Sequence, residues 1–141
     1  MTDIINRAFR ELDFGLNPLD EETGVSSNSV NGFSTEFVLD RDRNVLAARS
    51  RIVTVNDFYK RHAGQFMRGV LMLNRDGMLP SGFRVGLDMV DFTVDLIFET
   101  DLSAVSEENL PVALGNMIRN LIYFSGQVRQ KLSEDYDRLD G

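Results

Sequence analysis

Three closely spaced aspartates, Asp88, Asp91 and Asp95, are the residues best placed for chemistry. Carboxylates on one strand face can bind a divalent cation, or act as acid and base when neighbouring charges raise one pKa. Aspartates are also common on the solvent-facing side of a half-buried strand, where they have no chemical role. The sequence leaves both interpretations open, and these residues are the candidate metal ligands.

Other catalytic motifs are absent from the sequence. The chain has no cysteine and no phosphate-binding glycine loop, and its one histidine, His62, stands at a helical-period position near Phe58. The polar run that starts at Asp40 resembles the beginning of a calcium loop. It holds Val45 and Arg51 where such a loop needs glycine and glutamate. We therefore expect a non-enzymatic protein that binds no cofactor.

Charge is distributed unevenly along the 141 residues, whose net charge is −7. Residues 1–40 carry a net charge of −6, residues 41–84 of +6 and residues 85–141 of −7. One interpretation is that these segments lie together in the fold and neutralise one another. The other is that complementary patches bind copies of the chain or other protein subunits.

Only two of the 15 basic residues are lysines, and the others are arginines. Arginine is the basic residue better suited to protein interfaces. The interface candidates in the basic segment are Arg41, Arg43, Arg49 and Arg51. The same arginines could contact nucleic-acid phosphates beside stacking aromatic residues. The acidic flanks and the negative net charge disfavour a nucleic-acid partner.

Strand and turn patterns predict the elements that would position these residues. Residues 33–55 predict a β-hairpin. Residues 83–98 predict one long strand with a β-bulge near Met89–Val90, where the apolar positions change parity. A tight reversal there is the alternative, but no glycine or Asn-Gly pair supports it. Residues 16–32 hold many turn formers and predict a long polar loop. Residues 3–14 have the apolar spacing of a short N-terminal helix.

Two more helices are expected. A helical period runs from Phe58 to Leu71, although two glycines leave a strand over residues 65–74 as an alternative. Residues 111–138 keep a heptad-like apolar spacing. They predict either one helix about 40 Å long or two helices divided at Gly126.

The predicted fold is a single α+β domain over residues 1–141. A small antiparallel or mixed sheet is packed by the middle helix and the long C-terminal helix. Tyr136 and Leu139 lie where few apolar residues remain for core packing, so we expect them at a subunit contact.

Together these features favour a structural subunit of a homo-oligomeric assembly, such as a ring or tube component of a tailed virus. Two alternatives remain: a metal-dependent or acid–base enzyme that uses the three aspartates, and an adaptor that uses the arginines. No stretch approaches the roughly 20 apolar residues that span a bilayer, so no membrane partner is expected. A cysteine-free chain fits the cytoplasm, or a virus particle assembled there.

Overall fold

The structure, a computed structural model, describes residues 1–54, 63–75, 77, 79–88, 90–91 and 93–140. The side chains of residues 63–67 and 135–140 fall outside this description. The predicted start of the middle helix and His62 therefore lie outside the described residues.

The fold is α+β, as the sequence predicts, and its sheet is antiparallel throughout. In chain order the elements are α1 (Thr2–Glu11), β1 (Val25–Val30), β2 (Phe33–Asp40), β3 (Val45–Thr54), α3 (Ala63–Leu73), β4 (Phe83–Asp88), β5 (Thr93–Asp101), a short 3-10 helix (Leu102–Ala104) and α4 (Leu110–Asp140). The five strands lie in the order β1-β2-β3-β5-β4.

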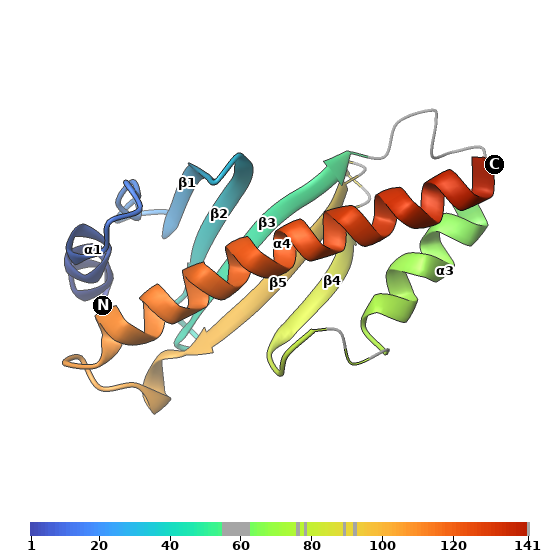
Figure 1. The fold of residues 1–141 in the computed structure, drawn as a ribbon. Coiled ribbons are helices and arrows are strands. Elements are labelled where there is room, and N and C mark those ends of the chain that lie inside the picture. The colour runs from blue at the N-terminus through green and yellow to red at the C-terminus, as the bar shows by residue number, and fades with distance from the viewer. Residues whose placement is uncertain (55–62, 76, 78, 89, 92, 141) are drawn as a thin grey trace.

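The described helices form one layer, and α4 runs diagonally across the sheet in Figure 1. Alternate residues of β2 and β3 point toward this layer, and most of them are apolar. Phe37 of β2 meets Phe9 of α1 with ring centroids 5.1 Å apart. Leu46 and Leu96 of the central strands are fully buried beneath α4. The core therefore lies between the sheet and the helices.

Helix α4 continues without a break through Gly126, which decides between the two predicted forms of the C-terminal helix. Its apolar stripe from Leu114 to Leu132 is buried. Ser125 is a polar residue within this stripe, but it is buried like its apolar neighbours. The Ser125 side chain is also buried, because its hydroxyl group is hydrogen-bonded to that of Ser50 on β3 at 2.9 Å. No described helix is both long and apolar enough to cross a membrane.

The predicted loop over residues 16–32 contains a strand, which corrects that expectation. Strand β1 pairs with β2 along its whole length, from Val25 opposite Val38 to Val30 opposite Phe33. The two strands are joined at Asn31 and Gly32, which both have positive φ angles, of 51° and 82°. Two-residue hairpins of this kind favour Asn-Gly, because both central residues adopt left-handed conformations.

The predicted bulged strand over residues 83–98 is two strands, β4 and β5, which pair with each other. The chain reverses between Asp88 and Thr93. The Asp88 carboxylate stabilises the reversal by accepting hydrogen bonds from the backbone N–H groups of Val90 and Asp91, at 2.9 and 3.1 Å. The change of apolar parity marks this turn and not a bulge. A register shift does occur in β3, between Arg51 and Val53.

Asparagine side chains occupy backbone groups at both outer strands. The Asn74 amide donates to the carbonyl oxygen of Val85 in β4 and accepts from its N–H, at 2.9 and 2.8 Å. On the other side, Asn17 donates to the carbonyl oxygen of Ser27 in β1 at 2.8 Å. These side chains satisfy edge groups that a neighbouring strand would otherwise pair.

Candidate interaction surface

The face of the sheet opposite the helices is open within the described part of the chain. Its strands present charged side chains at the positions that alternate with the core residues. This open face carries Glu36, Arg49, Arg51, Arg84, Asp88, Asp95 and Glu99. Small and aliphatic residues lie between them, and a groove of about 300 Å³ has Val38, Ala47 and Ile97 in its lining.

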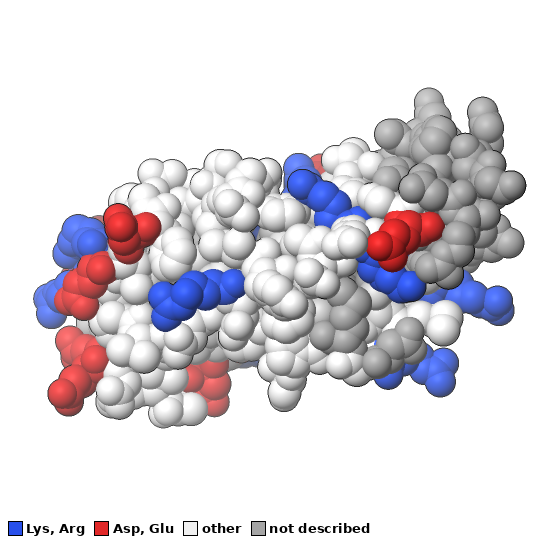
Figure 2. Space-filling view, viewed as in Figure 1, with Lys and Arg blue, Asp and Glu red and all other residues white. Residues whose placement is uncertain are grey.

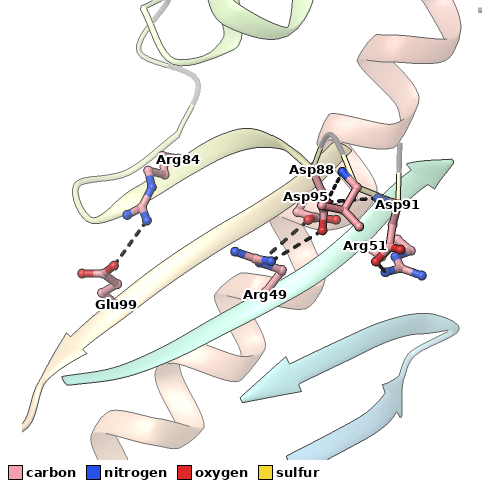
Figure 3. Close-up of polar contacts among 8 residues, drawn as sticks. Arg49, Arg51, Arg84, Asp88, Asp91, Asp95 and Glu99 are labelled. Carbon is pink, nitrogen blue, oxygen red and sulfur yellow. Dashed lines mark hydrogen bonds and ion pairs between the residues drawn. The ribbon is translucent and has the colours of Figure 1, made fainter. Parts of the chain in front are cut away.

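At one end of the open face, Glu99 receives two arginines. Arg43 donates to one of its carboxylate oxygens at 3.0 Å, and Arg84 to the other at 3.3 Å (Figure 3 shows the Arg84 pair). Burial acts to raise the pKa of the Glu99 carboxyl group, but the hydrogen bonds from Arg43 and Arg84 outweigh it. The pKa therefore lies below its usual value, and Glu99 is ionised at neutral pH.

At the other end, the structure brings together the three aspartates singled out by the sequence. They lie around Arg49 and Arg51 of β3 in Figure 3. Arg51 donates to Asp91 at 3.3 Å, while the Arg49 guanidinium lies 3.9 Å from Asp88 and 3.8 Å from Asp95. Hydrogen bonds from the backbone of Asp91 and Val90 lower the pKa of Asp88.

Asp95 differs from its two neighbours because its side chain is only 3% exposed. It lies opposite Arg51 on β3 and Gly86 on β4, in the middle of the sheet. Burial raises the pKa of its carboxyl group, and the Thr93 hydroxyl and Arg49 oppose this shift only in part. In the part of the chain that the structure describes, its Oδ1 atom and the Thr93 hydroxyl oxygen are buried without a hydrogen bond of good geometry.

The basic and acidic segments thus meet on the open face, as the first interpretation of the charge pattern expects. Among the described residues, no group of three histidine, cysteine or acidic side chains could hold a metal ion. The clustered aspartates are engaged by arginines instead, so the geometry gives no support to the candidate metal ligands Asp88, Asp91 and Asp95.

The remaining candidate residues lie elsewhere. Arg41, in the β2–β3 turn, donates to the carbonyl oxygens of Glu21 and Glu22 and to the Thr2 hydroxyl group. These contacts join the turn to the first residue of α1 and to the segment that follows the helix, so Arg41 supports the fold. Tyr136 and Leu139 belong to the last part of α4, where the side chains are outside the described residues, so their predicted contact role stays a prediction.

The helix layer carries a second surface feature, which the sequence analysis missed. An aromatic row, defined by Tyr123, Phe124, Phe83 and Phe98, crosses from α4 to β4 and β5 with neighbouring ring centroids 4.9, 5.7 and 4.4 Å apart. Tyr123 is 60% exposed, and a groove of about 360 Å³ lies beside Phe83, Phe98 and Met117.

The aromatic row depends on Gly82, whose φ angle is +92°. A Cβ atom there would stand 2.6 Å from the Phe98 ring. In the view of Figure 2, charged side chains gather mainly toward the two ends of the helix layer, and its middle is largely uncharged. Spacing within α4 identifies the core stripe, but the row joins different elements and needs their pairing to be known.

Comparison with known proteins gives a likeness of fold. No protein-family model matches the chain, and no curated protein sequence matches it. A chain of the HopA1-SchA chaperone-effector complex is 16% identical, with a TM-score of 0.62 and 91% of each chain covered. A chain of the ExsC-ExsE complex is 18% identical, with a TM-score of 0.63 and 94% of this chain and 96% of that one covered.

A chain of the ExoT-SpcS complex from Pseudomonas aeruginosa has the same fold, with 16% identity, a TM-score of 0.57 and coverage of 90% and 98%. The three similar structures are complexes between proteins, and one is named a chaperone-effector complex. The expectation of a ring or tube component of a tailed virus is therefore wrong. Oligomeric assembly was inferred from charge segments and helix length, which many interaction proteins share.

Proposed function

We propose that this protein is a non-enzymatic chaperone, which acts in the cytoplasm by binding a polypeptide segment of a partner protein. The observation that carries the proposal is the likeness of nearly the whole chain to a chain of a chaperone-effector complex. The likeness extends over both layers of the fold and not over one motif, since at least nine-tenths of each chain is covered.

The aromatic row is a surface feature that supports this proposal independently of the likeness of fold. A partner segment gains most from burying large side chains in an apolar groove, and aromatic residues commonly dominate binding free energy. Tyr123 and the groove beside Phe83 and Met117 provide such a site on the helix layer. The charged open face then supplies polar contacts that orient the segment.

The proposal is tested with a displayed library of unfolded segments cut from the proteins of the source organism. We expect enrichment of particular segments, which titration calorimetry then confirms as ligands of the full chain. The variant Tyr123→Ser should weaken their binding about tenfold, because it removes an exposed aromatic anchor. The matched control Val112→Ser removes an exposed apolar side chain outside the row and should leave the affinity unchanged.

Two results would contradict the proposal. One is enrichment no better than with an unrelated α+β protein of similar charge. The other is chemical change of a bound segment, seen by mass spectrometry, because a chaperone releases its ligand unaltered.

We further propose that the chain self-associates, as the sequence analysis expected. Leu71 and Met72 are adjacent on α3 and 58% and 46% exposed, although α3 buries Val70 and Leu73 on its other side. Light scattering after size-exclusion chromatography should give a mass above 16.0 kDa for the wild type. The double variant Leu71→Ser/Met72→Ser should have a lower mass with an unchanged circular dichroism spectrum, and a monomeric wild type would remove this proposal.

The predicted contact role of Tyr136 and Leu139 has its own test. Removing residues 134–141 leaves Leu132, the last residue of α4 described as buried, in place. If these residues form a subunit contact, the truncated chain should stay folded and assemble to a smaller mass. Normal assembly would show that the end of α4 makes no such contact.

A further inference from the structure

A small cavity opens beside the three aspartates on the open face. Its volume is about 160 Å³, and strands β1 to β5 all contribute to its lining, which includes Ser27, Glu36, Arg49, Asp88 and Asp95. Pockets for drug-sized ligands have volumes of roughly 300–1,000 Å³. The volume of this cavity equals that of about five water molecules in the liquid, at roughly 30 Å³ each, which is room for one side-chain head group.

Among the residues that the structure describes, the charges around the cavity do not balance. Two arginines, Arg49 and Arg51, face three aspartates, and Arg49 is shared between Asp88 and Asp95 at nearly equal distances of 3.9 and 3.8 Å. Glu36, on the neighbouring strand β2, adds a further carboxylate to the lining. The group lacks positive charge when every carboxylate is ionised.

The shortage of hydrogen-bond donors is greatest at Asp95. Its side chain is buried, and among the described residues no donor makes a hydrogen bond of good geometry to Oδ1. The Thr93 hydroxyl group lies close enough to the carboxylate to oppose the rise of its pKa, but it too lacks a hydrogen bond of good geometry there. The 3.8 Å contact of Oδ2 with Arg49 is longer than a hydrogen bond. A buried carboxylate oxygen without a donor is costly, because it has lost water and gained nothing in return.

We propose that this cavity receives a basic side chain of the bound partner polypeptide, whose cationic head group donates to Asp95. The cation supplies the missing positive charge and the missing donors together. A guanidinium suits the site best, because its planar fork presents several donors at once and both Asp95 and Asp88 line the cavity. This site depends on the proposed function in one respect: the cation is taken to belong to a bound polypeptide.

Nuclear magnetic resonance titration of the full chain with N-acetylarginine amide tests the site, with N-acetyllysine amide and N-acetylcitrulline amide in parallel. Citrulline is the neutral isostere of arginine. At constant ionic strength, we expect saturable shifts of the amide signals of Arg49, Arg51, Asp88 and Asp95 with arginine and smaller shifts with lysine. Citrulline should give none that saturate.

The variant Asp95→Asn should weaken arginine binding about tenfold, because a charge-assisted hydrogen bond is lost. The control Glu108→Gln removes an exposed carboxylate in the turn before α4 and should bind as the wild type does. Equal shifts with citrulline, equal affinity in Asp95→Asn, or shifts spread evenly over the acidic surface would overturn the site.

Failure of the site and failure of the proposed function give different results. If library segments bind the wild type and Asp95→Asn equally well, only the cation site is lost. If arginine amide binds at Asp95 but no segment is enriched, the cation site stands and the polypeptide partner is wrong.

Discussion

The two faces of the sheet differ in what their side chains contribute. On the helix-covered face, residues such as Phe37 and Leu96 are fully buried and pack against α1 and α4. On the open face, the neighbouring positions along the same strands hold arginines and carboxylates paired across strands. Alternation along each strand therefore separates core packing from surface charge, and a substitution should report which of the two its face provides.

The sharpest comparison is between Phe37 and Val38, which are adjacent in β2 but point to opposite faces. Phe37→Ala should lower the free energy of unfolding by about 3–5 kcal/mol, because it leaves a cavity against Phe9. Val38→Ala should cost less than about 1 kcal/mol, because Val38 is only partly buried. Urea denaturation measures both losses. Equal losses would show that side chains on the open face contribute as much to the free energy of unfolding as those on the helix-covered face.

The second comparison concerns a polar contact inside the helix-covered layer. Ser125→Ala should cost about 1–2 kcal/mol, because it leaves the buried Ser50 hydroxyl group without its partner. The double variant Ser50→Ala/Ser125→Ala should recover most of this loss. A double variant less stable than Ser125→Ala would indicate that the hydroxyl groups have other partners.

The third comparison uses pH to separate Asp95 from the other carboxylates. Its folded-state pKa is raised, so the folded state binds the proton more tightly and stability falls as pH rises from near 3.8 through the raised value. Asp88 and Glu99 have lowered pKa values, so their contribution is present at higher pH and is lost in acid.

Asp95→Asn should therefore be more stable than the wild type at neutral pH, by about 1 kcal/mol, since it removes a buried charge with an unpaired oxygen. The difference should shrink as pH falls below the raised pKa and Asp95 becomes protonated. Thermal unfolding from pH 3 to pH 8 checks this, with Asp91→Asn as the control. A constant difference across that range would refute the assignment to Asp95.

The smallest effect is expected at the rim of the open face. Arg84→Gln removes an exposed ion pair with Glu99, and such pairs contribute roughly 0–1 kcal/mol. Since Arg43 still donates to Glu99, the loss should be below about 0.5 kcal/mol and should vanish in high salt. A larger loss in urea denaturation would mean that the rim also stabilises the fold.

The sequence predicts much of this fold, and its errors have identifiable causes. Apolar spacing identifies α1, the β2–β3 hairpin and α4, because each buries one face against the core. Strand β1 was missed because its residues Ser26 to Ser29 are polar, although Asn31-Gly32 is a strong hairpin signal. The reversal after Asp88 was an alternative that the sequence disfavoured, because an aspartate side chain stabilises it and not a glycine.

The candidate site was predictable only as a set of residues. The sequence identifies Asp88, Asp91 and Asp95 as neighbours along the chain, and the hairpin does bring them together. The partnership of Asp95 with Arg49 and Arg51 depends on the register between β3 and β5. The burial of Asp95 depends on its place between two strands, and no spacing within one segment specifies that.

The asparagines at the two outer strands have a consequence for the behaviour of the protein at high concentration. An exposed strand edge is a template on which identical chains can stack, which leads toward fibres. Asn74 occupies both backbone groups of Val85, and Asn17 occupies the carbonyl oxygen of Ser27. Each amide thus blocks edge-to-edge pairing at its strand. The block is reversible, because a side chain can change rotamer, whereas a covalent block could not be removed in this way.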